Sequence, residues 1–327
     1  MEQSVFGRTG QRVSVCGVGT WQLGADWGDV PEAEAFAVLD ASLESGVTFF
    51  DTADVYGDGR SEQLIGRFLK ERPDAGVLVA TKMGRRVEQD PAHFTLDNFR
   101  AWTDRSRRNL GVDRLDLVQL HCPPTPVFSS DAVFDALDTL VEEERITAYG
   151  VSVETCAEAL AAIARPGTAS VQIIFNPFRL KPLDEVLPAA AEAGVGIIAR
   201  VPLASGLLSG RYTKDTVFAE NDHRTFNRHG EAFDQGETFS GVDFATGVEA
   251  AVEFAALAPE GATPAQTALR WIMQQPGVST VIPGARNAAQ ARANAGAAAL
   301  PPLPESTLEA VRELYDRRFR AEIHDRW

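Results

Sequence analysis

Three successive apolar runs of this sequence end near a side chain that can hold or transfer a proton. Asp51 lies at the end of the run 48–52, Lys82 at the end of 77–82 and His121 at the end of 115–121, and Tyr56 follows the first run in a short loop. Lys82 and Tyr56 stand out because the chain has only four lysines and four tyrosines. If the runs are parallel strands, their carboxyl ends meet at one edge and the four side chains should converge.

These four side chains form a set suited to the reduction of a carbonyl group. A phenol ordinarily loses its proton at about pH 10, and a neighbouring ammonium stabilises the phenolate and lowers its pKa. Asp51 would keep Lys82 charged and oriented, while His121 would hydrogen-bond the substrate carbonyl or assist the proton relay. Tyr56 would then act as the general acid that protonates a developing alkoxide while a hydride arrives at carbon.

Each residue taken alone also has a purely structural interpretation. Asp51 and Lys82 could be a buried ion pair at the rim of a sheet, Tyr56 a packing residue and His121 a histidine with its hydrogen bonds satisfied. The convergence of all four on neighbouring strand ends favours the catalytic interpretation.

Short apolar runs alternate with longer amphipathic segments along almost the whole chain, which predicts a parallel sheet with crossover helices. Eight runs are candidate strands because their interiors are almost continuously apolar, as in strands buried on both faces. They are 15–20, 48–52, 77–82, 115–121, 146–152, 170–176, 196–200 and 280–284. Eight such units favour one closed (β/α)8 barrel, a single α/β domain over residues 1–327, above an open doubly wound sheet.

Three further elements accompany the predicted barrel. Segments 4–6 and 12–14 flank a turn that ends at Gly10 and predict a small hairpin. The polar segment 212–242 follows the seventh strand, and so long a connection is usually a binding lid or disordered. We expect its two histidines, His223 and His229, to be solvated. A last helix is expected over about 305–320.

Cap residues predict where several of the helices begin. Ser61 is a candidate cap for the helix that follows the second strand. Thr155 with Glu158, and Thr263 with Gln266, have the spacing of a capping box.

Composition excludes several classes of protein. The 31 basic and 46 acidic side chains leave a net charge of −15, which disfavours nucleic acid and anionic membranes as partners. No run approaches the roughly 20 apolar residues that span a bilayer. Cys16, Cys122 and Cys156 are too few for a disulfide framework and read as reduced thiols. Without a recognisable secretion signal at its start, the chain is expected to be cytoplasmic.

Several short stretches, taken together, make the sequence resemble the aldo-keto reductase superfamily over nearly its full length. Individually the matches are weak, but their order is highly specific. They are FFDTADVYG (49–57), ATK (80–82), DLVQLH (116–121), GVS (150–152), Gln172, FN (175–176), PLASGLLSG (202–210) and IPGAR (282–286). The resemblance is to bacterial NADPH-dependent members and in places to relatives of the potassium-channel beta subunits. It implies that Asp51, Tyr56, Lys82 and His121 are a catalytic tetrad with Tyr56 as proton donor.

The resemblance also implies NADPH, bound in an extended form at the barrel mouth. The segment 17–22 agrees, because it lacks the third glycine of the GxGxxG pattern of Rossmann domains. Ser152 and Gln172 would hold the carboxamide. The loop 203–207 would hold the pyrophosphate, and Arg286 suits the 2′-phosphate because guanidinium matches phosphate in charge and shape. The full implied set is Gly19, Thr20, Trp21, Asp51, Ser152, Gln172, Arg200, Pro202, Leu203, Ser205, Gly206, Leu207, Gly284, Arg286, Gln290 and Asn294.

The sequence departs from many relatives at three of these positions. Val153 replaces an asparagine after Ser152, and Gly284 replaces a lysine near the 2′-phosphate. Arg200 replaces an aromatic residue that stacks on the nicotinamide. A guanidinium plane can also stack there, or it could recognise an acidic or phosphorylated substrate.

Two rival functions stay open at this point. Some relatives with an intact tetrad act as non-catalytic, nucleotide-sensing subunits of protein complexes. A metal-dependent barrel hydrolase is the other, but the five histidines show neither HxH nor HExxH spacing and no metal is expected.

The substrate is expected to be a small carbonyl compound, and oligomerisation is not readable. The pocket should include Trp21, Tyr56, His121, Arg200 and parts of 212–242. Trp27, in the loop 25–29, is a candidate for the barrel mouth, and Trp327 could fold back to the pocket or stay free.

Overall fold

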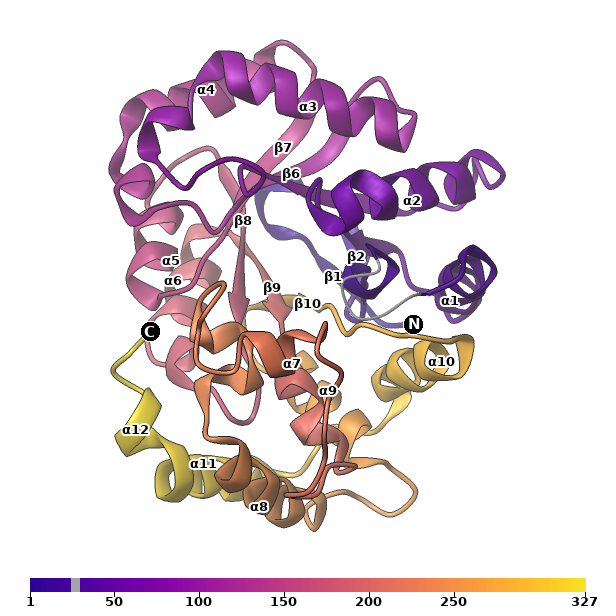
Figure 1. Cartoon of the computed structure of the whole chain (residues 1–327), viewed down its shortest axis with the longest axis vertical. Helices are drawn as coiled ribbons and strands as arrows, with labels where there is room; N and C mark the ends of the chain where they lie inside the picture. Colours follow the sequence, from indigo (N-terminus) through magenta and orange to yellow (C-terminus); the bar gives the residue numbers. More distant parts are fainter. Residues whose placement is uncertain (25–29) are drawn as a thin grey trace.

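The computed structural model describes residues 1–24 and 30–327 and shows the predicted barrel (Figure 1). Its eight parallel strands follow the order of the chain around the sheet. They are β3 (Val18–Gly19), β4 (Phe49–Asp51), β5 (Leu78–Met83), β6 (Leu115–His121), β7 (Ile146–Ser152), β8 (Thr168–Ile174), β9 (Gly196–Arg200) and β10 (Val278–Val281). Parallel bridges from Cys16 to Val281 and from Gly19 to Gly284 close the seam between the first and last strands.

Most of the helices lie around the outside of this sheet, whereas the short α7 belongs to the segment 212–242 and is drawn in front of the barrel (Figure 1). They are α1 (Glu32–Glu44), α2 (Arg60–Lys70), α3 (Leu96–Leu110), α4 (Asp131–Glu142), α5 (Cys156–Ile163), α6 (Val186–Ala193), α8 (Phe244–Ala255), α9 (Pro264–Met273), α10 (Ala288–Gly296), α11 (Glu305–Tyr315) and the short α7 (His223–Phe226) and α12 (Ala321–Ile323). The predicted last helix is α11 with a π-helical turn over Asp316–Arg320. Among the described residues, no helix is both long and apolar enough to cross a bilayer.

The capping predictions are confirmed at two helices and wrong at a third. Both capping boxes form, at Thr155 on α5 and at Thr263 on α9. Ser61 does not cap α2, because Gly59 with φ 94° precedes the helix and Ser61 lies inside its first turn. The Ser61 hydroxyl is buried and hydrogen-bonds the hydroxyls of Thr20 and Thr52, each at 2.8 Å. Its role is to join α2 to the ends of the first two strands.

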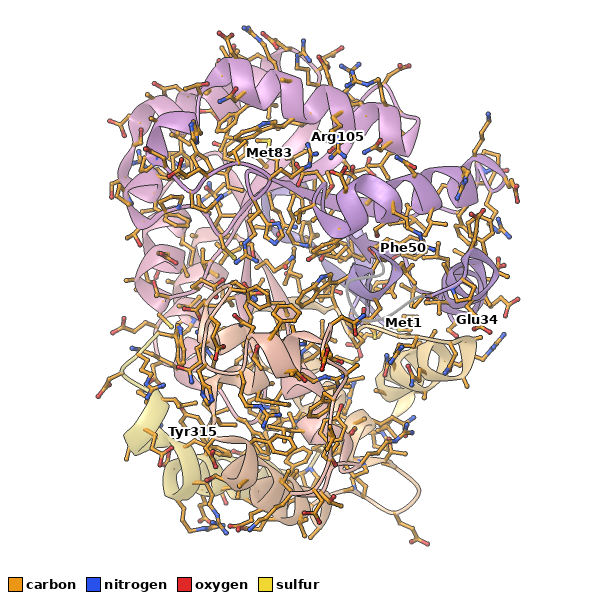
Figure 2. The ribbon with its side chains drawn as sticks, in the orientation of Figure 1. Met1, Glu34, Phe50, Met83, Arg105 and Tyr315 are labelled. Carbon is orange, nitrogen blue, oxygen red and sulfur yellow. The ribbon has the colours of Figure 1, made fainter. Side chains whose placement is uncertain are left out.

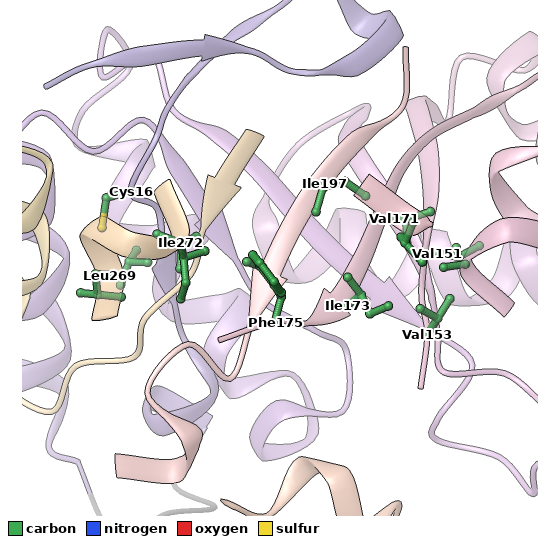
Figure 3. Close-up of a cluster of buried hydrophobic side chains, with 14 of the residues drawn as sticks. Cys16, Val151, Val153, Val171, Ile173, Phe175, Ile197, Leu269 and Ile272 are labelled. Atoms are coloured by element: carbon green, nitrogen blue, oxygen red, sulfur yellow. The ribbon is translucent and has the colours of Figure 1, made fainter. Parts of the chain in front are cut away.

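The main core lies between the sheet and its helices. Phe50 of β4 and Met83 of β5 belong to this layer, and Figure 2 labels both. Figure 3 shows a further part of it, where strand residues such as Val171 and Ile197 share one buried cluster with Leu269 and Ile272 of α9. Strands covered on both faces explain why the sequence runs were continuously apolar.

A second, smaller core fills part of the barrel and includes Phe6 and Val13 from the hairpin. Strands β1 (Gln3–Val5) and β2 (Arg12–Ser14) pair antiparallel as predicted, and Gly10 has φ 66°. Phe6 is fully buried with its ring centroid 5.4 Å from that of Phe49. A Cβ at Gly7 would lie 2.5 Å from backbone atoms of both Ala169 and Gly196. The hairpin therefore packs closely against the amino-terminal ends of β8 and β9.

The segment 212–242 is folded onto the barrel, with short 3-10 turns at Gln235–Glu237 and Phe239–Gly241. The expectation that both histidines are solvated is wrong for His223. Its side chain is buried and its Nδ1 lies 3.2 Å from Thr238 Oγ1, whereas His229 is exposed. The short helix α7 buries His223, which a reading of polarity alone could not show.

Trp327 folds back, but onto the segment 212–242 and not into the main cavity. Its Nε1 donates to Asp234 Oδ1 at 2.9 Å, and the Arg179 guanidinium lies 4.2 Å from its ring centroid. A Cβ at Gly241, which has φ 80°, would lie 2.2 Å from the indole. The expectation for Trp27 falls on 25–29, outside the described residues.

Replacing Trp327 by alanine should lower the free energy of unfolding by about 2–4 kcal/mol. The change removes a buried indole, its hydrogen bond to Asp234 and its contact with Arg179. Urea unfolding followed by circular dichroism measures the loss. Val252→Ala, at a side chain that is 69% exposed on α8, is the control and should change stability by less than about 0.5 kcal/mol. Equal stability of the two variants would contradict the packing described for Trp327.

Candidate active site

Asp51, Lys82 and Tyr56 meet at the carboxyl ends of β4 and β5. Lys82 Nζ lies 2.5 Å from Asp51 Oδ1 and 3.3 Å from the Tyr56 hydroxyl. It also donates to the carbonyl oxygen of Thr52 at 2.9 Å. Three acceptors thus surround one ammonium whose side chain is only 1% exposed. The strand ends therefore bring together three of the four predicted residues as hydrogen-bonded partners.

The other carboxylate oxygen of Asp51 is held by two amides. Gln172 Nε2 donates to Asp51 Oδ2 at 2.8 Å, and Gln119 Nε2 does so at 3.2 Å. Gln172, which the resemblance assigns to a cofactor carboxamide, is thus also a partner of Asp51. Gln119 was missed by the sequence analysis. Its signal was available, because it precedes His121 by two positions on the same strand and so shares its face.

Burial and the local charges determine the protonation of Tyr56 and Lys82. Burial raises the pKa of Tyr56, and the neighbouring Lys82 ammonium offsets this only in part. The ammonium therefore lowers the pKa of this phenol as expected, but burial, which the sequence did not reveal, outweighs it and leaves the pKa raised. For Lys82, burial lowers the pKa, but Asp51 and Tyr56 outweigh it and the pKa is raised. Near neutral pH the site holds a protonated phenol beside an ammonium.

His121 is held as a neutral imidazole next to Tyr56. Their rings meet edge to face with centroids 5.9 Å apart. Burial, followed by the positive charges of Arg85 and Lys82, lowers the pKa of His121 well below its usual value. Nδ1 is buried without a hydrogen-bond partner among the described residues. A neutral ring at this position can donate or accept one hydrogen bond at the cavity.

Aromatic side chains form a wall beside the Tyr56 ring. Trp21, in the 3-10 turn Trp21–Gly24, stacks on Tyr56 with centroids 6.0 Å apart. The centroid of the Trp21 ring also lies 5.2 Å from that of His223 and 6.1 Å from that of Phe233. Trp21 is therefore a wall of the cavity, the first of the two roles that its position allowed. His223 and Phe233, from the segment 212–242, were not predicted.

A cavity of about 710 Å³ extends from this wall across the barrel mouth to α10. It is lined by most of the residues that the resemblance assigns to a cofactor. These are Gly19, Trp21, Asp51, Ser152, Gln172, Arg200, Pro202, Leu203, Ser205, Gly206, Gly284, Arg286, Gln290 and Asn294. Thr20 and Leu207 are fully buried and lie outside the lining. The Thr20 hydroxyl instead donates to the carbonyl oxygen of Asp51 at 2.8 Å.

The middle of the cavity is bordered by a strained backbone. Val201, Ala204 and Ser205 have φ of 52°, 48° and 52°, and Gly206 has φ 98°. Non-glycine residues seldom adopt these values, and such strain concentrates at functional sites. A Cβ at Gly206 would lie 2.3 Å from the Tyr212 hydroxyl, so glycine is required there.

The far end of the cavity lies at the start of α10. Gln290 Oε1 accepts from the backbone N–H of Arg286 at 2.9 Å, and Asn294 Nδ2 donates to the carbonyl oxygen of Gly284 at 3.1 Å. The Arg286 side chain is exposed and forms no ion pair with a described residue. A Cβ at Gly284 would lie 2.2 Å from the Gln22 amide, so a side chain there would displace Gln22, which also lines the cavity.

Four charged residues form a buried network beside the cavity, and three of them were not predicted. Arg200 Nη2 donates to Glu154 Oε2 at 2.8 Å and to the carbonyl oxygen of Val153 at 3.0 Å. Arg85 Nη2 donates to Glu237 Oε1 at 2.7 Å and lies 3.4 Å from Glu154 Oε1. We call Arg85, Glu154, Arg200 and Glu237 the arginine–glutamate network. Both carboxyl groups are shared by the two guanidiniums: Glu237 stays ionised between them, whereas burial raises the pKa of Glu154 to about 8.

One trio near this network has the geometry of metal ligands. Atoms of Cys122, Glu154 and Glu237 lie within 4.8 Å of one another. Two guanidiniums already pair with these carboxylates, and burial raises the pKa of the Cys122 thiol to about 12. Because a thiol must lose its proton to bind a metal ion, we interpret the trio as part of the ion-pair network.

Asp54 is a buried carboxyl behind the Tyr56 turn. It is 1% exposed and its Oδ1 has no hydrogen-bond partner among the described residues. Arg105, labelled on α3 in Figure 2, donates to its carbonyl oxygen at 3.0 Å. Burial and the Glu62 carboxylate raise the pKa of Asp54 to about 7, although Arg86 and Arg105 lower it.

The chain belongs to the aldo/keto reductase family, because the model of that family matches residues 16–316. It is therefore an oxidoreductase of the aldo-keto reductase class. The sequence is 36% identical to aldo-keto reductase str7 of Strobilurus tenacellus over 86% of this chain and 81% of that protein. It is 28% identical to aldo-keto reductase yakc [NADP(+)] of Schizosaccharomyces pombe, over 93% and 89%. The fold matches that of glycerol dehydrogenase AKR11B4 from Gluconobacter oxydans, with a TM-score of 0.77, 27% identity and coverage of 97% and 96%.

The buried carboxyl of Asp54 should make stability depend on pH. Its pKa of about 7 in the folded protein exceeds the unfolded value of about 3.9, so the folded state holds the extra proton between these values. Stability then falls as pH rises through this window. Asp54→Asn should therefore gain about 1–3 kcal/mol relative to the parent chain between pH 5 and pH 8.

Urea unfolding at several pH values measures this gain. Asp243→Asn is the control, because the pKa of Asp243 is lowered and its carboxylate stays ionised over the whole range. A gain for Asp54→Asn that does not change with pH would show that Asp54 is ionised throughout.

Proposed function

We propose that the protein reduces an aldehyde or ketone to an alcohol with NADPH, and that Tyr56 donates the proton. The observation that carries this proposal is the placement of the Tyr56 hydroxyl 3.3 Å from the Lys82 ammonium, on the wall of the main cavity. Near neutral pH this phenol keeps its proton, as a general acid must.

The cavity lining suits an extended dinucleotide. Ser152 and Gln172 offer a hydroxyl and an amide near Tyr56, and the 3-10 turn Ala204–Ser209 borders the middle. Arg286 and the backbone N–H groups at the start of α10 offer positive charge at the far end. The name of the yeast relative, which carries NADP(+), supports the same cofactor. When bound, NADPH supplies the hydride.

The chain's own residues supply the proton and stabilise the charge that its loss leaves behind. Tyr56 donates its proton to the carbonyl oxygen, and the ammonium of Lys82 stabilises the resulting phenolate. Asp51 keeps Lys82 charged at 2.5 Å, while Gln119 and Gln172 fix the carboxylate from the other side. Neutral His121 can hydrogen-bond the same substrate oxygen and orient the carbonyl.

The substrate compartment is bounded by Trp21, Tyr56 and His121, so we propose a small uncharged carbonyl compound as substrate. Aromatic rings provide an apolar wall, and the guanidinium of Arg200, which lines the same cavity, is already held by Glu154 and Glu237. The structurally similar glycerol dehydrogenase supports a small alcohol or carbonyl partner.

Replacing Tyr56 by phenylalanine should lower kcat by at least about 100-fold, because it removes the proton donor and nothing else from the cavity wall. The Kd for NADPH should stay within about twofold of the parent value, since the ring that stacks on Trp21 is retained. Oxidation of NADPH against a panel of aldehydes, ketones, sugars and pyridoxal measures turnover, and NADPH fluorescence measures binding.

Tyr315→Phe is the matched control, because Tyr315 is buried outside the cavity and its hydroxyl lies near His324. Its kcat should equal that of the parent chain. Undiminished turnover in Tyr56→Phe would exclude Tyr56 as the acid. Tight NADPH binding without turnover on any carbonyl compound would favour the nucleotide-sensing alternative.

A further inference from the structure

The stretch 237–240 of the long segment after β9 is hydrogen-bonded to its surroundings at every residue. The backbone N–H of Phe239 donates to Ser205 Oγ at 3.0 Å, and Ser205 Oγ donates to the carbonyl oxygen of Glu237 at 3.2 Å. Thr238 Oγ1 accepts from Asn227 Nδ2 at 3.1 Å, and Asn176 Nδ2 donates to Ser240 Oγ at 2.7 Å. These bonds hold the stretch against the carboxyl ends of the barrel strands.

The backbone of this stretch is strained, so its position depends on those bonds. Phe239 and Ser240 have φ of 53° and 61°, and both are non-glycine residues in the left-handed region. Each such residue costs roughly 1 kcal/mol or more relative to a relaxed backbone. The contacts that the stretch makes in the observed position must offset this cost.

Glu237 supplies the charged contact of this stretch. Its carboxylate lies 2.7 Å from Arg85 Nη2 and 3.9 Å from Arg200 Nη1. The three side chains are only 7%, 22% and 10% exposed, respectively. Ion pairs this well buried lose little to solvent screening, but removal of one partner leaves an unpaired buried charge.

The remaining members of the arginine–glutamate network come from the barrel itself. Arg85 follows β5, Glu154 follows β7, and Arg200 ends β9, whereas Glu237 belongs to the long segment. Arg200 and Ser205 line the cavity, and so does Glu237 itself. The stretch 237–240 contacts both residues, so it borders the cavity beside the end of β9 and the strained turn that follows.

We propose that Glu237 is a positioning residue, whose pairing with Arg85 and Arg200 holds the stretch 237–240 closed and thereby shapes the cavity for NADPH. The inference rests on the proposed function for the identity of the cofactor. Loss of the Glu237 charge should open the segment 212–242 while the barrel strands keep their places.

Glu237→Gln is the direct test, with Glu220→Gln as the matched control. Both variants make the same chemical change within the segment 212–242, but the Glu220 side chain is exposed. Without cofactor, limited proteolysis should cut within 212–242 at least about tenfold faster in Glu237→Gln than in the parent chain. Its Kd for NADPH should rise by at least about tenfold, and Glu220→Gln should match the parent in both measurements.

A purely structural role for Glu237 would change the melting temperature and not the affinity for NADPH. It would lower the melting temperature but leave the Kd for NADPH unchanged at temperatures where circular dichroism shows a native fold. Glu237→Asp, which keeps the charge, should restore part of the affinity. If Glu237→Gln fails to fold, Arg85→Gln removes the same ion pair from the barrel side, and cleavage and Kd equal to the parent values in that variant would overturn the proposal.

Neither readout needs turnover, so the two proposals fail separately. A parent chain that binds NADPH without reducing any carbonyl would contradict the proposed reaction. The role of Glu237 would still be testable by the Kd for NADPH and by the cleavage rate. A parent chain that binds no NADPH would sink the proposed cofactor, and the cleavage rates alone would then decide whether Glu237 closes the segment.

Discussion

The buried ion pair between Lys82 and Asp51 is the interaction on which the candidate site depends. An ammonium and a carboxylate that are 1% and 3% exposed are costly to bury unless each is well paired and hydrogen-bonded. Here Lys82 has three acceptors and Asp51 has three donors. The ion pair also holds the Lys82 ammonium 3.3 Å from the Tyr56 hydroxyl. The interaction that stabilises the two buried charges therefore also places a positive charge beside the phenol.

Much of the fold could be predicted from the sequence because it depends on interactions between residues close together in the chain. The eight strands were predicted to within a few residues, since strands covered on both faces must be apolar throughout. The capping boxes at Thr155 and Thr263 were correct for the same reason, because a cap is a contact between near neighbours in the chain. Ser61 shows the limit of this logic, since its hydroxyl is taken by Thr20 and Thr52 from other elements.

The candidate site was predictable in part, and the missed residues share a physical cause. Asp51, Lys82 and His121 lie at strand ends, with Tyr56 in the turn after the first of them, and their convergence follows from the barrel. The arginine–glutamate network joins residues far apart in the chain, and no residue spacing in the sequence predicts that Glu237 pairs with Arg85. The net rise in the pKa of Tyr56 was missed because it depends on the degree of burial, which only the packed structure shows. His223 was misread because polarity alone does not reveal that a long connection is folded.

The seam of the barrel has a consequence for how the protein responds to a bound molecule. The first and last strands meet through isolated bridges, and one of these joins Gly19 to Gly284, two cavity-lining residues without side chains. The cavity therefore extends across the seam between the first and last strands. A ligand bound there would contact both strands of the seam, so its binding and the stability of the closed barrel would be thermodynamically linked.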